Sequence, residues 1–248
     1  MNPHLFRLEL RRFVRNRRTL LFTAILPAVF FLTFSASSSG SIAGLNVAPY
    51  IMVSMATYGA MNALFVGGGV IAAERAIGWP RQLRVAGLSP REYVTSKVAV
   101  AYLTGIPGLL AVFVLGAAAK HVQLSAAHWL LAAVSILVGL LPVAVLGVAV
   151  GYAARPQTLQ ALFGIGSALL ALLGGMFAPA DNFPRVLLDV CKLLPTYWSA
   201  DAGRAVLRGS WVGWHGALVL ALWTVALGAA AAALYQRDAL RPGVSGTT

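Results

Sequence analysis

Long apolar stretches separated by short polar ones dominate the pattern of this sequence. These stretches lie at about residues 19–36, 49–73, 98–119, 129–153, 161–178 and 211–235. A helix of about 20 apolar residues is long enough to cross the hydrocarbon core of a bilayer. The pattern therefore predicts an all-α polytopic membrane protein, with six transmembrane helices forming one domain over residues 19–235 and a short tail over residues 236–248.

The first 18 residues have a different pattern, in which apolar and basic residues recur at helical spacing. The apolar set is Leu5, Phe6, Leu8, Leu10, Phe13 and Val14, and the basic set is Arg7, Arg11, Arg12, Arg15, Arg17 and Arg18. Such a segment is typical of an amphipathic helix lying in the membrane interface. We expect it to anchor the chain on anionic lipid, and it can also touch a cytoplasmic partner.

Proline and glycine interrupt the apolar segments at several points. Pro27, Pro107 and Pro142 fall inside the first, third and fourth expected spans, where each removes a backbone hydrogen bond and favours a kink. Gly147 and Gly151 form a G-x-x-x-G pair. Small residues at this spacing allow two helix backbones to approach closely, so we expect close packing there.

Composition and charge placement narrow the class further. Hydrophobic residues make up 59% of the 248 residues and charged residues only 10%, which excludes an ordinary soluble domain, where about 25% are charged. The net charge of +12 could suggest nucleic acid, but fourteen of the 19 Lys and Arg lie on one side of the predicted topology. Because short cytoplasmic loops carry the basic excess, this asymmetry predicts that both termini are cytoplasmic. Topology then explains the charge without a nucleic-acid partner.

Several kinds of chemistry have no signal in the sequence. The single cysteine, Cys191, excludes an internal disulfide, and no His/Cys cluster has metal-ligand spacing. The predicted spans carry no Asp, Glu, Lys or Arg away from their ends, which disfavours an ion-coupled carrier. No G-x-x-x-x-G-K-[ST] loop is present, so we expect no cofactor on this chain and nucleotide energy, if used, to come from another chain.

The loop between the second and third expected spans, residues 73–97, is the longest on the basic side. It mixes charges with Trp79, Leu83 and Val85, and Ser89 can cap the helix that follows. A short amphipathic helix with an aromatic anchor suits docking into a groove on a partner. In order, the loop contains Glu74-Arg75, Gly78, Leu83-Arg84, Leu88-Ser89-Pro90 and Ser96-Lys97. This order resembles the loop after the second helix in the membrane subunits of ABC type-2 exporters.

A second resemblance to the same family follows the fifth expected span. The matching segments are Gly174-Gly175-Met176-Phe177-Ala178-Pro179, Asn182-Phe183-Pro184, Leu194-Pro195-Thr196-Tyr197-Trp198 and Asp201-Ala202-Gly203-Arg204. They are similar to the family's outward-facing re-entrant segment, which dips partly into the membrane. The apolar positions between residues 186 and 194 are interleaved with Asp189 and Lys192, which predicts an amphipathic helix too short to span.

The resemblance implies an export permease that pairs with a separate ATP-binding subunit, which holds ATP and Mg, and with a second permease copy, either identical or a paralogue. It implies that a coupling helix between the second and third spans contacts the ATPase through Glu74, Arg75, Trp79, Arg81, Leu83 and Arg84. The N-terminal helix supports this contact through Arg11, Phe13 and Arg15. Substrate is expected between the two copies, near Met55, Asn62, Phe65, Leu169 and Leu172.

The apolar composition favours a hydrophobic or amphipathic substrate, such as a drug, a natural product or a lipid. Abundant Ala, Gly, Val and Arg with only three lysines is typical of a GC-rich genome, which favours a bacterial plasma membrane. Two other readings stay open at this point: a carrier or channel that works without ATP, and a membrane assembly or sensor component whose basic loop binds a signalling partner.

Overall fold

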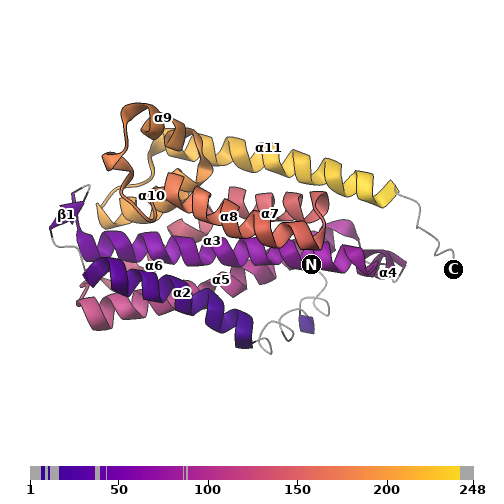
Figure 1. Ribbon diagram of the computed structural model, residues 1–248, viewed down its shortest axis with the longest axis horizontal. Coiled ribbons are helices and arrows are strands. Elements are labelled where there is room, and N and C mark those ends of the chain that lie inside the picture. The colour runs from indigo at the N-terminus through magenta and orange to yellow at the C-terminus, as the bar shows by residue number, and fades with distance from the viewer. Residues whose placement is uncertain are drawn as a thin grey trace.

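The computed structural model describes residues 7–8, 11, 17–36, 40–42, 44–85, 87 and 89–240. The chain forms an elongated helical bundle with one very small antiparallel hairpin (Figure 1). In chain order its elements are α2 (Arg17–Ala36), β1 (Ser41–Ile42), β2 (Leu45–Asn46), α3 (Val47–Ala76), α4 (Trp79–Val85), α5 (Pro90–Lys120), α6 (Ala126–Gly139), α7 (Leu141–Ala153), α8 (Pro156–Leu173), the 3-10 helix η1 (Ala180–Asn182), α9 (Arg185–Leu193), α10 (Pro195–Leu207) and α11 (Gly213–Leu240).

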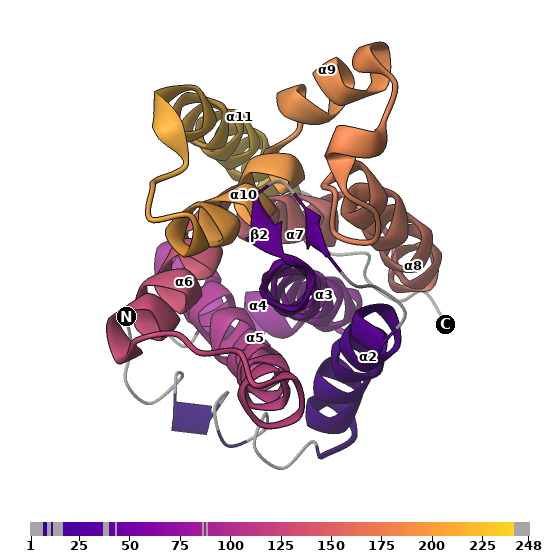
Figure 2. The same ribbon diagram turned by 90° about the vertical axis from the view of Figure 1, so that its left-hand side faces the viewer.

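Helix α3 is the centre of the bundle. Figure 2 shows it surrounded by α2, α5, α7, α8 and α10, with α11 and α9 on the outside. In its most apolar window, 72% of α3 is buried inside the chain, whereas the corresponding value for α11 is 6%. The main hydrophobic core therefore lies around α3, and α11 presents most of its apolar surface outward.

Among the residues that the structure describes, five helical segments are long and apolar enough to cross a membrane. They are Val47–Ala76, Glu92–Lys120, Ala126–Ala153 (α6 with α7), Pro156–Leu173 and Gly213–Asp238. These confirm the second to sixth expected spans. The first, residues 19–36, lies in α2, whose shorter apolar part runs from Thr23 to Ala36. A membrane crossing by this first span therefore stays a prediction, as do the predicted boundaries of the domain.

Helix boundaries differ from the expected ones where proline and glycine act. The fourth expected span is broken between α6 and α7, and Pro142 lies in the first turn of α7, as its missing N–H favours. In contrast, α2 and α5 continue through Pro27 and Pro107. Helix α8 begins and ends five residues before the expected 161–178. Its end is set by Gly174 and by Gly175, which has a φ of +66°.

The predicted close helix contact at Gly147 and Gly151 is confirmed. A Cβ atom added to Gly68 of α3 would lie 2.3 Å from the carbonyl oxygen of Gly147, and one added to Gly151 would lie 2.6 Å from the carbonyl oxygen of Gly68. The two backbones are therefore too close for any side chain at these positions. Gly164 and Gly166 on α8 differ, because a Cβ there would meet nothing within 4 Å.

The region between α8 and α11 holds two short helices where the sequence predicted one. Helix α9 matches the predicted amphipathic helix and leaves Val186 and Leu193 exposed. Helix α10 was not predicted, and it packs into the bundle against α6 and α3. Both lie at the end of the bundle opposite α4 (Figure 1).

Candidate functional site

The candidate site is the connection from α3 through α4 to α5. A short helix lies where the sequence predicts the coupling helix, and Pro80 falls in its first turn, where its missing N–H costs nothing. Gly78, with a φ of +74°, makes the turn from α3, and its N–H donates to the carbonyl oxygen of Arg75. After the loop, Ser89 caps α5 in a reciprocal pair with Glu92. The turn at Gly78 fixes where α3 ends, and the cap at Ser89 fixes where α5 begins.

Glu74, in the last turn of α3, is buried and bound within the chain. Its side chain accepts a hydrogen bond of 2.7 Å from the Tyr93 hydroxyl. It also forms an ion pair of 2.6 Å with the Lys97 ammonium. Both partners belong to α5. A buried carboxylate is tolerated when it is paired and hydrogen-bonded, as it is here. Glu74 therefore joins α3 to α5 directly behind the loop.

Arg75 joins the same turn of α3 to two further helices. One guanidinium nitrogen donates to the carbonyl oxygen of Gly151 in α7 at 2.9 Å, and another forms a 2.5 Å ion pair with Asp238 near the end of α11. The guanidinium carbon lies 5.2 Å from the centre of the Tyr152 ring. The Glu74-Arg75 pair thus ties α3 to α5, α7 and α11.

These contacts give Glu74 and Arg75 partners inside the chain, and their expected contact with an ATPase stays a prediction. Trp79 is half-buried. The exposed side chains at this end include Ile77 at 74% and Val85 at 91%. Ile77 was missed, although an apolar residue beside a turn glycine in a loop is a recognisable signal.

The other expected contact residues are placed only in part. Arg81, Leu83 and Arg84 belong to α4, and their side chains lie outside what the structure describes. Phe13 and Arg15 lie outside the described residues, and Arg11 is exposed. The predicted N-terminal amphipathic helix stays a prediction.

The five residues expected along the substrate path are not brought together. Met55 and Phe65 are buried in the core, and Phe65 stacks on Phe163 at 5.1 Å between ring centres. Asn62 is half-buried and donates to the carbonyl oxygen of Tyr58. Leu169 and Leu172 are exposed on α8, by 54% and 42%. In this conformation only the α8 pair presents apolar surface outward.

A second polar cluster, at the opposite end of the bundle, was also missed. Arg204 of α10 is 3% exposed, and its guanidinium donates to the carbonyl oxygens of Gly174 and Gly175 at 3.3 and 3.1 Å and to the Tyr50 hydroxyl. It satisfies carbonyls left open at the end of α8, which explains why α10 is held in the core. The small residues Ala202, Gly203 and Ala205 beside Arg204 were a usable signal of burial.

Comparison with known proteins places the chain in a family. Residues 33–233 match the family described as "ABC-2 family transporter protein". A relative, "Putative transport permease YvfS" of Bacillus subtilis (strain 168), is 26% identical over 215 residues, which cover 86% of this chain and 87% of the relative. The resemblance predicted from the loop and the outer segment is thereby confirmed. The chain belongs to the ABC-2 family of transporters, as a multi-pass membrane permease.

Proposed function

We propose that this chain is the membrane subunit of an ATP-driven exporter, powered by a separate ATP-binding subunit and completed by a second permease copy. The family membership supports the ATP-binding partner. The observation that carries the proposal is the construction of the α3–α4–α5 connection, in which a short helix with exposed apolar residues sits on helix ends tied together by buried ion pairs.

The docking surface in this proposal is the exposed side of the loop, centred on Ile77 and Val85. Exposed apolar side chains at 74% and 91% are costly in water and are typical of a surface covered by a partner. Trp79, Arg81, Leu83 and Arg84 of α4 stay the proposed contact residues beside this surface. Glu74 and Arg75 take a transmitting role in this proposal.

The transmission follows from the contacts of these two residues. A push on α4 acts on the last turn of α3, which is coupled to α5 through Glu74 and Lys97 and to α7 and α11 through Arg75. The helix ends then move as one unit when the ATPase dimer closes. Binding of ATP on the partner subunit would shift the permease between two packings of the same helices.

The proposed substrate is hydrophobic or amphipathic, and its path lies between two copies along α3 and α8. Leu169 and Leu172 supply apolar surface on α8, and Asn62 supplies a polar group on α3. Met55 and Phe65 would join the path only after the helices separate. Export, with both termini in the cytoplasm, is the direction and orientation that we propose for a bacterial plasma membrane.

The test is copurification with candidate ATP-binding subunits, comparing Val85→Asp with Val186→Asp. Both residues are exposed valines, but Val186 lies on α9 at the far end of the bundle. We expect Val85→Asp to lower ATPase recovery by about tenfold or more, equivalent to about 1.4 kcal/mol of binding, and Val186→Asp to leave it unchanged. Equal recovery in both variants, or no ATPase with the unmodified chain, would overturn the docking surface.

Direction and energy source need a second measurement. The complex is reconstituted in vesicles, and ATP-dependent movement of a fluorescent amphipathic dye is followed from the side on which ATP is added. Movement away from the ATP side supports export. Dye transport by the chain alone, without an ATPase, would instead favour an ATP-independent carrier.

A further inference from the structure

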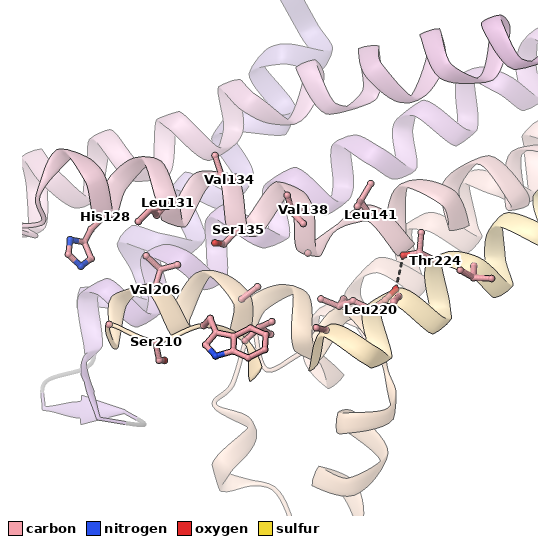
Figure 3. Close-up of a pocket in the computed structure, with 18 residues that line it drawn as sticks. His128, Leu131, Val134, Ser135, Val138, Leu141, Val206, Ser210, Leu220 and Thr224 are labelled. Atoms are coloured by element: carbon pink, nitrogen blue, oxygen red, sulfur yellow. Dashed lines mark hydrogen bonds between the residues drawn. The ribbon is translucent and has the colours of Figure 1, made fainter. Parts of the chain in front are cut away.

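Residues of α6, α10 and α11 line a groove. Figure 2 shows these three helices on the opposite side of α3 from α8. Its volume is about 850 Å³, within the range of about 300–1,000 Å³ typical of small-molecule sites. Figure 3 shows Leu131, Ser135 and Val138 of α6 on one wall and Leu220 and Thr224 of α11 on the other. The groove is separate from the proposed substrate path.

The walls of this groove are almost entirely apolar, and its polar groups are concentrated toward one end. His128 and Ser210 lie on opposite walls at the end farthest from α4, and Trp211, which follows Ser210, is 66% exposed. Trp214 and His215 follow at the start of α11, where Trp214 is also 63% exposed. Tryptophan is enriched where a helix leaves the hydrocarbon for the interface. The groove therefore runs from the interface level toward the centre of the bilayer.

One polar group stands deeper in the groove without a partner. The Ser135 hydroxyl makes no hydrogen bond to any described residue, and it is half-buried among the apolar wall residues. Ser135 follows His128 by seven residues in α6, so it lies about 10 Å farther along the groove, toward α4. A hydroxyl facing hydrocarbon without a hydrogen bond is unfavourable, so an occupant with a polar atom at this depth would be favoured.

The face that α11 presents outward beside the groove is also apolar. Leu218, Leu222 and Val225 of α11 are exposed by 48%, 59% and 71%, and only 6% of the most apolar window of this membrane-crossing helix is buried in the chain. When α11 spans a membrane, the groove therefore faces hydrocarbon and not water. A molecule with a hydrocarbon chain and polar groups at two depths matches both the walls and the polar positions.

We propose that this groove is a binding site for one phospholipid of the adjacent leaflet. One acyl chain lies between α6 and α11, an ester oxygen accepts a hydrogen bond from Ser135, and the headgroup lies at the level of His128 and Ser210. The site does not depend on the proposed export function. It requires only that the chain spans a membrane.

The test uses the full chain in nanodiscs that contain a phospholipid with a photoreactive diazirine in one acyl chain. After irradiation, labelled peptides are mapped by mass spectrometry. Ala221→Phe would fill the groove, and Ala229→Phe is the matched control, because Ala229 is exposed on the same helix and does not line the groove. Ser135→Ala removes the proposed hydrogen bond with little change in shape.

We expect labelling to concentrate on peptides of α6, α10 and α11, with a loss of about tenfold in Ala221→Phe, about threefold in Ser135→Ala and none in Ala229→Phe. Labelling spread evenly over all outward helix faces, and unchanged in Ala221→Phe and Ser135→Ala, would overturn the site. A disulfide formed between the two copies of an Ala221→Cys variant in the same nanodiscs would overturn it as well, because a protein and not a lipid would then fill the groove.

Discussion

At the scale of single residues, the ion pair of Glu74 with Lys97 carries the sharpest prediction. Their side chains are 11% and 3% exposed, so neither charge is well solvated by water. Glu74→Gln leaves the Lys97 ammonium buried without a counter-charge, and we expect a loss of about 3–5 kcal/mol in the free energy of unfolding. Denaturant titration of the purified chain in detergent measures this.

The double variant Glu74→Gln, Lys97→Met is the control for that experiment. Removing both charges leaves no unpaired ion, so most of the lost stability should return. A single variant as stable as the unmodified chain would show that the pair does not hold α3 to α5.

Arg204 gives a second prediction at this scale, because its forked guanidinium bonds four separate acceptors. Lysine keeps the charge but not the fork, so Arg204→Lys should lose about 2 kcal/mol or more and speed proteolysis between residues 175 and 195. Arg208→Lys is the matched control. Arg208 pairs with Asp201 and is 30% exposed, so its loss should stay below about 1 kcal/mol. Equal effects in both variants would contradict a special role for Arg204.

At the scale of whole elements, the contact of α3 with α7 depends on glycine at three positions. Gly68→Ala would place its Cβ 2.3 Å from the Gly147 oxygen, so the helices must separate, at a cost of about 1–3 kcal/mol. Gly164→Ala is the control, because nothing lies within 4 Å and alanine is the better helix former. We expect a lower melting temperature for the first variant only. A similar lowering in both variants would show that the loss does not come from the close contact between α3 and α7.

Much of the element order was predictable, because a membrane span is recorded in the sequence as a long apolar run. The second to sixth spans, the loop helix and the Ser89 cap all follow from local residues. Helix α10 was not predictable in this way. Its sequence, PTYWSADAGRAVL, is mixed and short, and its burial arises from packing on α6 and from the Arg204 contacts with Gly174 and Gly175. Such tertiary contacts override local propensity.

The candidate site was also predictable from the sequence only in part. The sequence indicated that the loop after α3 is functional, since its residues are too varied for a plain connector. It did not indicate which side chains face inward, because Glu74 and Arg75 find partners 19 to 163 positions away in the chain. Long-range pairing of this kind has no local pattern, so residues that bind within the chain and residues exposed on its surface look alike in the sequence.

At the scale of the whole molecule, the two ends of the bundle are predicted to face opposite sides of the membrane. Thiol labelling can test this orientation, because the single native cysteine is buried. α4 lies at one end and η1 with α9 at the other (Figure 1). The Cys191 side chain is fully buried, and burial raises the pKa of its thiol. A raised pKa lowers the reactive thiolate fraction at a given pH, so Cys191 should react slowly with maleimide at pH 7 and faster only as pH rises. The unmodified chain should therefore take up little maleimide at pH 7.

Gln82→Cys and Asn182→Cys place new thiols at the two ends of the bundle. Both are exposed amide residues, on α4 and η1 respectively. Since the basic excess lies at the α4 end, a membrane-impermeant maleimide added to intact cells should label Asn182→Cys, and it should label Gln82→Cys only after permeabilisation. The reverse pattern would invert the orientation and place α4 outside, beyond the reach of any cytoplasmic ATPase. Labelling of both thiols in intact cells would mean that the two ends of the bundle do not face opposite sides of one membrane.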